Sequence, residues 1–415
     1  MSNFHQEELI YWLAFDSLKG IGLGPKRIKN LFDHFSSLQR AWLADESELK
    51  EIETIPAGVI EAFVRERQNF SLEKPLEKVY RYGIKAITQI DPLYPHQLNQ
   101  LVQPPLVIYA KGIWDLNWFE KSIGIVGTRE ASDYALTQTR QISSQLASMD
   151  FTIISGMALG IDSAAHYGAF DVQNSRCVAV VANGVEQIVP ASSRPIYKAL
   201  MENGLVLSEY PPEILPEKGY FPARNRIVAA LSQAVLVSEA GARSGALITA
   251  ERAIEMKKPV FGLVGRADNK QSEGIHRWIR KGLARLITST EDILEEMEML
   301  SSMPSQINML EDASLFLAEQ KKQSTMQRKS SEKKDVEKNN SSNQTTTQSN
   351  TKSIDIASLN ESEKNIYSTL LEADSISMDR LVELTSMPIH KINSTLMTLE
   401  LKKIIKRQGP SICRA

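Results

Sequence analysis

The chain has 415 residues, of which 48 are Lys or Arg, 50 are Asp or Glu and two are Cys, and its formal charge is −2. This length exceeds what one ordinary hydrophobic core organises, so we expect two or three domains. The small net charge argues at first against a nucleic-acid partner, but it hides strong segregation. Residues 1–120 carry −3, 121–290 carry +4, 291–320 carry −8, 321–353 carry +5 and 354–415 carry 0. The distribution of charge, rather than its sum, decides which partners a surface attracts.

Disulfide-rich and membrane-spanning proteins are excluded by composition. Cys177 and Cys413 cannot build a disulfide framework or a Cys-based metal site, and we expect no bound metal ion. The N-terminus lacks the positive region and apolar run of a secretory signal, and no apolar run approaches the roughly 20 residues that span a bilayer. We therefore expect a cytoplasmic protein that does not associate with membranes.

Residues 1–80 predict a helical domain. Gly20-Ile-Gly22-Leu-Gly24 precedes Pro25, a residue favoured at helix starts, and the apolar side chains between Ile28 and Phe35 share one helical face. This pattern resembles a helix-hairpin-helix, in which backbone amides and nearby basic side chains would meet DNA phosphates. A small helical packing or protein-interaction domain explains the pattern equally well, and the sequence leaves this choice open.

Residues 121–300, within a domain expected over residues 81–300, alternate short apolar runs with helix-length segments. This alternation predicts an α/β fold with a parallel sheet covered on both faces, a Rossmann-like domain. Ligands of such sheets bind in the loops that follow the carboxyl ends of the strands. The acidic stretch from Glu291 to Met299 is expected to be the last helix. The expected strands are Ile123–Val126, Phe151–Ile154, Cys177–Ala182, Leu205–Leu207, Val235–Val237, Val260–Val264 and Ala284–Ile287, and the expected helices include Tyr134–Ser148, Pro195–Glu202, Leu247–Lys257 and Ile275–Lys281.

The remaining residues predict a linker followed by a small domain. Residues 301–353, above all Lys321 to Ser353, are rich in Ser, Thr, Asn, Gln and Lys and bury too little apolar surface to fold, so we expect a disordered linker. Residues 354–415 predict helices near 361–371, 378–385 and 388–401 and a wing at 404–413. This arrangement resembles a winged helix. Its charge is zero, so a protein-interaction role and an auxiliary DNA role are equally open.

Three expected strand-to-helix loops, 127–132, 155–162 and 239–249, are rich in Gly and small hydroxyl residues. Glycine lets the backbone approach a ligand closely, and free amides at a helix N-terminus favour anions. Three such loops at one sheet edge predict a site for several phosphates, although a tight turn alone would explain each loop taken singly. The loop residues expected in this site are Gly127, Thr128, Arg129, Ser132, Ser155, Gly156, Gly160, Arg243, Ser244 and Gly245.

Known nucleotide and hydrolase motifs are absent from these loops. No Gly precedes a Lys, which excludes a Walker A loop, and neither of the first two loops has the glycine spacing of a dinucleotide site. His166 lies one helical turn after Asp162, but we expect a structural histidine rather than a general base. The sequence assembles no catalytic constellation, so we expect no enzyme active site and no cofactor.

Basic and aromatic residues occur near the same sheet edge. The segment Lys218-Gly-Tyr-Phe-Pro-Ala-Arg-Asn-Arg226 supplies Lys218, Arg224, Asn225 and Arg226 around Phe221, and Arg129 lies in the first loop. Single-stranded nucleic acid is held by this combination of phosphate-binding cations and base-stacking rings. The alternative is that Arg224 and Arg226 cap a helix or pair with Glu209 and Glu239, with Phe221 in the core. The sequence does not decide between the two interpretations.

Taken in order, these motifs carry a family resemblance. They are Tyr94-Pro95, Pro104-Pro105-Leu106, Gly127-Thr-Arg129, Ser155-Gly-x-Ala-x-Gly-Ile-Asp162, Ser208-Glu-Tyr210, Phe221-Pro-x-Arg-Asn-Arg226 and Ser244-Gly-Ala-Leu-Ile-Thr249. The series resembles the DNA-processing protein A family, DprA/Smf, over about residues 90 to 290. The resemblance implies a Rossmann-like domain that forms a homodimer and binds single-stranded DNA without enzymatic activity or a nucleotide cofactor. It also implies protection of incoming DNA, loading of the recombinase RecA during natural transformation, and a DNA groove that uses Arg129, Lys218, Phe221 and the glycine loops.

The chain departs from that family in places, and two other functions stay open. Gly265-Arg266 stands where a Pro-Gly is usual, and Ile275-His276 replaces a usual Thr-Asn, so the role of that rim is not established by the resemblance. A Rossmann-like nucleotide hydrolase or phosphoribohydrolase would use Glu239 to polarise a water near the Ser244 loop, but the glycine run usual before that glutamate is missing. A scaffolding adaptor would act through the terminal domains.

Overall fold

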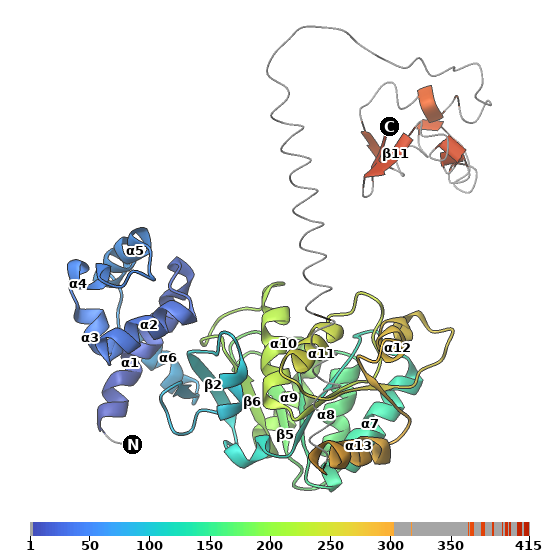
Figure 1. Ribbon diagram of the computed structural model, residues 1–415, viewed down its shortest axis with the longest axis horizontal. Helices are drawn as coiled ribbons and strands as arrows, with labels where there is room; N and C mark the ends of the chain where they lie inside the picture. The colour runs from blue at the N-terminus through green and yellow to red at the C-terminus, as the bar shows by residue number, and fades with distance from the viewer. Residues whose placement is uncertain are drawn as a thin grey trace. The chain divides into compact units, whose positions relative to one another are not determined.

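The computed structural model describes residues 3–302, Leu317 and part of the C-terminal region. The described C-terminal residues are 364, 366–368, 375–377, 384–385, 392, 395–396, 398–399, 405–408 and 411–414. The chain divides into two compact units, 1–328 and 329–415 (Figure 1). The linker expected at 301–353 lies outside the described residues except for 301–302 and Leu317. Across these described ranges, no helix is both long enough and apolar enough to cross a membrane.

The N-terminal region is helical, as predicted. Helix α2 begins at Pro25, directly after a turn in which Gly22 takes a φ of +97°, a conformation that favours glycine. Rings of Phe15 and Phe63 stack at 5.0 Å between centroids, and Trp42 packs edge-on against both. This aromatic cluster packs the three helices that carry these rings against one another. The helices are α1 (Asn3–Leu18), η1 (Lys19–Ile21), α2 (Pro25–Phe35), α3 (Leu38–Leu43), α4 (Glu46–Lys50), α5 (Ala57–Gln68) and α6 (Glu73–Arg81).

A nine-stranded sheet follows, with the strand order β1-β2-β6-β5-β4-β3-β7-β8-β9. All neighbouring pairs from β6 to β9 are parallel, whereas β2 pairs antiparallel with both β1 and β6. The strands are β1 (Lys85–Thr88), β2 (Val107–Gly112), β3 (Ser122–Val126), β4 (Thr152–Ser155), β5 (Cys177–Val180), β6 (Leu205–Ser208), β7 (Ala234–Val237), β8 (Val260–Leu263) and β9 (Arg285–Ile287).

The seven strands expected between 121 and 290 are confirmed, and the parallel sheet is correct for those strands. Strands β1 and β2 were not expected, because no α-helix separates them and the prediction searched for strands alternating with helices. The segment between them holds only the short turn η2 (His96–Gln100). The sheet is therefore mostly, rather than wholly, parallel.

Helices cover both faces of the sheet, as expected for buried parallel strands. One face packs against α7 (Asp133–Ser148), α8 (Ile161–Phe170), α9 (Arg194–Asn203) and α13 (Thr290–Ser302). The other face packs against α10 (Tyr220–Leu231), α11 (Ala246–Glu255) and α12 (Glu273–Arg280). The sequence analysis did not place α8 or α10. Helix α10 begins inside the basic-aromatic segment, so it distributes that segment's side chains around a helix axis.

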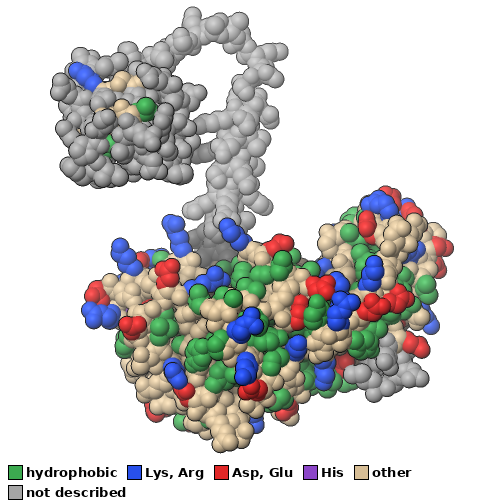
Figure 2. Space-filling model, turned by 180° about the vertical axis from the view of Figure 1, so that it is seen from behind, with side chains coloured by type: hydrophobic (Ala, Val, Ile, Leu, Met, Phe, Trp, Pro, Cys, Tyr) green, Lys and Arg blue, Asp and Glu red, His purple; other side chains and the backbone are tan. Residues whose placement is uncertain are grey.

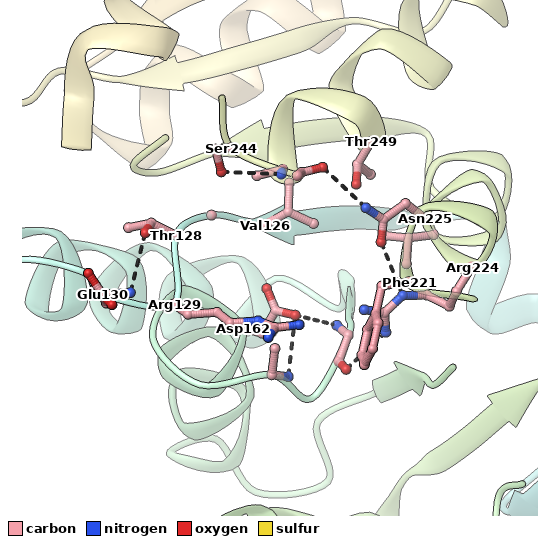
Figure 3. A pocket seen from close by; sticks show the side chains of 16 residues that line it. Val126, Thr128, Arg129, Glu130, Asp162, Phe221, Arg224, Asn225, Ser244 and Thr249 are labelled. Atoms are coloured by element: carbon pink, nitrogen blue, oxygen red, sulfur yellow. Dashed lines mark hydrogen bonds between the residues drawn. The ribbon is translucent and has the colours of Figure 1, made fainter. Parts of the chain in front are cut away.

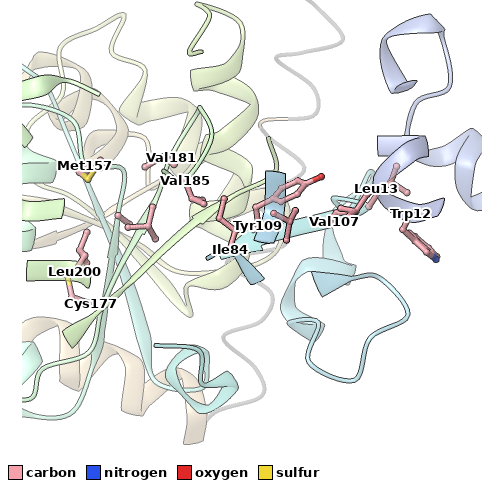
Figure 4. Packing of buried hydrophobic residues seen from close by; sticks show 14 of the residues in the cluster. Trp12, Leu13, Ile84, Val107, Tyr109, Met157, Cys177, Val181, Val185 and Leu200 are labelled. Carbon is pink, nitrogen blue, oxygen red and sulfur yellow. The ribbon is translucent and has the colours of Figure 1, made fainter. Parts of the chain in front are cut away.

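The N-terminal helices and the sheet share one hydrophobic core. Buried side chains run without a break from Trp12 and Leu13 of α1 to Val107 and Tyr109 of β2 (Figure 4). The Tyr109 hydroxyl donates a 2.9 Å hydrogen bond to Asp16 across this junction, and both side chains are buried. The expected boundary near residue 80 therefore falls inside one packed unit, and the domain boundaries themselves stay a prediction.

The C-terminal unit contains a three-stranded antiparallel sheet of β10 (Ser375–Ser377), β12 (Ser411–Arg414) and β11 (Ile405–Gln408). Strands β11 and β12 form the hairpin expected as a wing. Ile392, Leu396 and Leu399 are buried at the spacing of one helical face, inside the third expected helix. The bounds of the three helices expected here lie partly outside the described residues.

Candidate nucleic-acid interface

The candidate interface lies where the winding of the sheet reverses. From β3 the chain proceeds through α7 to β4 on one side, whereas β7 pairs with β3 on the other side and leads through α11 to β8. Ligands of open α/β sheets bind at such switch points, beyond the carboxyl ends of the strands. A cavity of about 360 Å³ opens there (Figure 3). It is lined by Val126, Gly127, Thr128, Arg129, Glu130, Gly156, Ala158, Asp162, Phe221, Arg224, Asn225, Val228, Ser244, Gly245, Ala246 and Thr249.

Three glycines bring the surrounding loops into close contact. A Cβ on Gly127 would lie 2.4 Å from the Ile161 side chain, and one on Gly160 would lie 2.4 Å from the Thr128 carbonyl oxygen. Gly160 also has a φ of +75°. A Cβ on Gly156 would meet the Arg224 guanidinium at 2.5 Å. These glycines are therefore required by loop-on-loop packing, which is the structural interpretation that the sequence left beside the phosphate interpretation.

Several backbone amides that were expected to meet phosphates bond within the protein instead. The Thr128 amide donates to the Glu239 carbonyl at 2.7 Å, and the Ile161 amide at the start of α8 donates to the Thr128 carbonyl at 3.2 Å. The Gly156 and Ala158 amides donate to the Asp162 carboxylate at 3.1 and 3.4 Å. The attraction of this cavity for an anion therefore comes mainly from side-chain cations.

Arg129 is the exposed cation of the cavity. Its guanidinium carbon lies 5.1 Å from the centre of the half-buried Phe221 ring, a cation–π distance. Figure 3 shows the two side chains entering the cavity from opposite elements, the loop after β3 and the start of α10. A ring and a guanidinium plane both stack on nucleic-acid bases, and the guanidinium also binds phosphate. Together they place a cation and an aromatic ring side by side in the cavity wall.

Arg224 has a different environment from Arg129. It is 5% exposed, and its guanidinium donates to the Gly156 carbonyl at 2.9 Å and to the Val180 carbonyl. Burial raises the pKa of the Asp162 carboxyl, and the nearby Arg224 charge opposes that rise. Burial likewise lowers the pKa of Arg224. Arg224 thus joins α10 to the loop that follows β4, and it contributes its positive field to the cavity floor.

The other polar residues expected here fall into two groups. Asn225 lines the cavity and donates to the Gly245 carbonyl at 3.2 Å, and the Ser244 hydroxyl accepts from the Ala246 amide at 3.3 Å. Arg226 faces away from the cavity and forms an ion pair with Glu209, whose pKa is raised by burial. The pairing of Arg226 with Glu209 was the alternative stated from the sequence.

Six of the expected residues do not line the cavity. Ser132, Ser155 and Gly160 support the loops from behind: the Ser155 hydroxyl, for example, is buried and donates to the Ile125 carbonyl at 2.7 Å. Arg226 is paired with Glu209, as described above. Lys218 and Arg243 are exposed in the turns just before α10 and α11, outside the cavity wall. The side chains of Lys218 and Arg243 are therefore accessible to a longer ligand that extends beyond the cavity.

The sequence analysis missed several lining residues, notably Glu130, Ala158, Asp162, Val228, Ala246 and Thr249. Val228 lies one helical turn after Arg224 and Asn225, and Thr249 lies one turn after Gly245. The helical period would have identified both positions if α10 and the start of α11 had been placed. Glu130 is an exposed acid at the rim, and no motif distinguishes it from other surface acids.

Glu239, which a hydrolase would need as its carboxylate, does not line the cavity. It is 1% exposed and accepts hydrogen bonds from the Ser132 amide at 2.8 Å, the Ser132 hydroxyl at 2.9 Å, the Asn269 side chain and the Ser272 hydroxyl at 3.3 Å. These donors come from both neighbouring loops. Glu239 therefore holds the loop that carries Arg129 in place rather than activating a water.

His166 is structural, as expected. It is fully buried, its Nδ1 lies 3.0 Å from the Cys177 sulfur, and its ring stacks on Phe170. Burial lowers the pKa of His166 to about 3, so the ring is neutral at neutral pH. No group of three or more His, Cys, Asp and Glu side chains that could hold a metal ion occurs among the residues that the structure describes.

The residues that depart from the family pattern, Gly265-Arg266 and Ile275-His276, have structural roles. The Gly265 amide donates to Nε2 of His276 at 3.2 Å, Arg266 pairs with Asp268 at 3.0 Å, and Ile275 is fully buried. None of these residues lines the cavity. The departures at Gly265-Arg266 and Ile275-His276 therefore leave the cavity wall itself unchanged.

Charge elsewhere on the surface is mixed. On the face shown in Figure 2, Lys and Arg side chains are interspersed with Asp and Glu, and hydrophobic side chains gather between them. The positive charge of residues 121–290 therefore does not form one continuous block on that face.

Comparison with known proteins gives family matches in two parts of the chain. Residues 85–298 match the family described as DNA recombination-mediator protein A, and residues 354–409 match the DprA winged helix domain. Protein Smf of Synechocystis is 40% identical over 71% of this chain and 73% of its own length. DNA processing protein DprA of Streptococcus pneumoniae is 33% identical over 68% of this chain and 96% of its own length.

A solved structure supports the same assignment. The X-ray structure of DNA processing protein A from Streptococcus pneumoniae aligns with a TM-score of 0.60 at 29% identity, and the alignment covers 69% of this chain and 97% of that chain. The matched region contains the switch-point cavity, and the second family match contains the described strands β10 and β11. The chain therefore belongs to the DNA recombination-mediator protein A family, DprA/Smf.

Proposed function

We propose that this protein binds single-stranded DNA at the switch-point cavity and acts there as a recombination mediator without catalysing a reaction. The observation that carries the proposal is the Arg129–Phe221 platform, an exposed cation 5.1 Å from an aromatic ring at the mouth of a cavity of about 360 Å³. A base can stack on this platform while a neighbouring phosphate meets Arg129. Lys218 and Arg243, exposed beside the cavity, would bind the flanking phosphates.

The concave shape of the cavity favours a single strand over a duplex. Bases in a duplex are stacked on one another, so an aromatic ring inside a cavity reaches only a base that has left the stack. The volume suits one nucleotide rather than a helix. Gly245, which has open space where a Cβ would lie, would let the backbone of the strand approach the loop before α11 closely.

The finer role that we propose is to protect incoming single strands and load RecA on them during natural transformation, as a homodimer. Support comes from the family description, DNA recombination-mediator protein A, and from relatives named DNA processing protein DprA. Glu239, the carboxylate that a hydrolase would use, is buried and saturated with protein donors, which favours a binding role over a catalytic one.

The proposal is tested by oligo-dT binding at several salt concentrations. Combining Arg129→Ala with Lys218→Ala is expected to weaken binding at least tenfold and to lower the salt slope by about 1.4, since each lost phosphate contact on a single strand contributes about 0.7. Arg280→Ala removes an exposed arginine from the far end of α12 and serves as the matched control. Unchanged affinity in the folded double variant would refute the assignment.

The recombination role needs its own measurements. Strand exchange by RecA on DNA coated with a single-strand-binding protein should start sooner when this protein is added, and the double variant should lose that effect. Sedimentation at micromolar concentration should show a dimer. Release of a free base from nucleoside monophosphates would instead favour the phosphoribohydrolase alternative.

A further inference from the structure

A second cavity, of about 580 Å³, lies where the N-terminal helices meet the sheet. Its wall combines four aromatic rings with three lysines, and they are Phe70, Tyr109, Tyr210, Tyr220, Lys19, Lys74 and Lys78. The remaining wall is mostly proline and small polar residues. Nothing in the proposed function uses this cavity, although its chemistry is that of a single-strand-binding surface, rings beside cations.

The rings of this cavity are already arranged for stacking. Tyr210 and Tyr220 lie 4.2 Å apart between centroids with an interplanar angle of 22°, and the Lys19 ammonium lies 5.7 Å from the Tyr210 centroid. Tyr210 is buried, and burial raises its pKa, so it stays a neutral ring. Tyr220 is half-buried and presents the outer part of the stack. A base entering the cavity can continue a stack that is formed before it arrives.

The charge balance of the wall leaves a cation for phosphate. Asp16, the carboxylate in the wall, is 2% exposed and accepts hydrogen bonds from the Tyr109 hydroxyl at 2.9 Å and from Lys19 at 3.2 Å. Lys78 pairs with Glu213 at 2.7 Å. Lys74 is exposed and has no carboxylate within ion-pair distance among the described residues. The mouth of the cavity is therefore positive, which complements a phosphate group.

Consecutive residues at the start of α10 line the two cavities. Phe221 lines the switch-point cavity and Tyr220, the preceding residue, lines the second cavity. Consecutive helical residues point about 100° apart around the axis, so one turn of α10 presents one ring to each cavity. Lys218 is exposed in the turn just before this helix. Lys218 therefore offers a cation to a strand that extends from Phe221 to Tyr220.

We propose that the second cavity holds another nucleotide of the same single strand, with its base against Tyr220 and its phosphate at Lys74. This inference rests on the proposed function, since the strand must first occupy the switch-point cavity. It assigns the N-terminal helices a direct part in DNA binding, through the loop before α6 and through α6 itself. Short oligonucleotides fill only the first cavity, and longer ones gain affinity from the second.

The test is a length series of oligo-dT from about 4 to about 16 nucleotides, the range of site sizes known for single-strand-binding folds. Combining Lys74→Ala with Tyr220→Ala is expected to lower affinity for the longest oligonucleotide about tenfold and to leave the shortest unchanged. Lys74→Arg combined with Tyr220→Phe should restore long-oligonucleotide binding. Lys85→Ala, an exposed lysine on β1 outside both cavities, is the matched control.

A direct readout accompanies the affinities. A photoreactive thymidine at one end of the longest oligonucleotide is expected to cross-link to the peptide that contains residues 69–78. Equal affinity of wild type and the Lys74/Tyr220 variant at every length overturns the inference, and so does an equal loss at every length. Failure of the wild type to bind any oligonucleotide overturns the proposed function instead, so the two failures are distinguishable.

Discussion

Arg129, Arg224 and Arg226 lie close together in space, yet each guanidinium has different partners. Arg129 is exposed beside Phe221, Arg224 is buried against the carbonyls of Gly156 and Val180, and Arg226 pairs with Glu209. The sequence placed all three in one DNA site, since residue type alone does not distinguish a ligand-binding guanidinium from one that serves packing. The distinction lies in how far each guanidinium is buried and in how many of its N–H donors already bond to acceptors within the protein.

Arg224→Ala is expected to reduce the free energy of unfolding by about 3 kcal/mol, because it leaves buried carbonyl groups without a donor and Asp162 without its neighbouring cation. Arg129→Ala should change stability by less than about 0.5 kcal/mol, as an exposed substitution does. Urea denaturation of both variants checks this difference. Equal stabilities would contradict the structural role given to Arg224.

His166 makes stability depend on pH. Its pKa is about 3 in the folded protein against 6.5 for an ordinary histidine. Below pH 6.5 the unfolded chain therefore binds a proton at this residue, whereas the folded chain stays unprotonated there until the pH approaches 3. Stability is therefore full above pH 6.5 and falls as the pH decreases towards 3. His166→Gln should remove roughly 2–3 kcal/mol of the difference between pH 7 and pH 4.5. Denaturant midpoints at the two pH values measure it, and identical profiles for both proteins would contradict it.

At the scale of elements, the cavity depends on loops that contact one another closely. The loop after β3 is held by Glu239 at the end of β7, and it touches Gly160 before α8. The side chains of helix α10 have different surroundings. Tyr220 lines the second cavity and Phe221 lines the first, whereas Arg224, at the wall of the first cavity, is buried. The basic-aromatic segment is thus divided by the helix rather than presented as one surface.

Gly160→Ala tests the loop contact. The new Cβ would lie 2.4 Å from the Thr128 carbonyl at a φ of +75°, so the loop that carries Arg129 must move, and we expect a cost of about 1–3 kcal/mol together with weaker oligo-dT binding. Gly219→Ala is the control, since open space surrounds Gly219 and its φ is −69°. Thermal melts and binding curves compare them. Normal binding by Gly160→Ala would show that loop position is unimportant.

At the scale of the whole molecule, strand order creates the cavity. Strand β3 lies between β4 and β7, so loops that are more than 100 residues apart in sequence, after β3 and after β7, share one sheet edge. The N-terminal helices join the sheet through the core around Tyr109, and this junction contains the second cavity. All lining residues of both cavities belong to the first compact unit.

Removal of residues 329–415 is therefore expected to leave affinity for oligo-dT within about twofold of the full chain, because every residue that lines either cavity lies in 1–328. Fluorescence anisotropy with the shortened and the full-length protein measures this. A large loss would place part of the binding surface in the winged-helix unit. The same shortened protein separates DNA binding from any adaptor role of the C-terminal unit.

Much of the fold was predictable because buried parallel strands such as Val235–Val237 are apolar without interruption. Strands β1 and β2 were missed because no α-helix separates them, and α10 was missed because Pro222 and two arginines obscure its apolar face. The position of Arg129 and the Ser244 loop at one cavity was also predictable, since each lies in a loop that follows a strand end, whereas Phe221 was assigned from its basic-aromatic segment and the family resemblance. The sequence did not predict that the side chains of four expected site residues bond to other groups of the protein, and these residues are Ser132, Ser155, Arg224 and Arg226.

The sequence by itself determined the family, the helical N-terminus, the α/β core and the segregation of charge behind a net value of −2. These properties follow from composition, hydrophobic periodicity and local motifs, which are visible in short stretches of the sequence. Only the tertiary structure decided which cations face solvent and which aromatic ring belongs to which cavity. The reason is physical: burial, donor satisfaction and neighbouring charge depend on contacts between residues far apart in the chain, and those contacts exist only after folding.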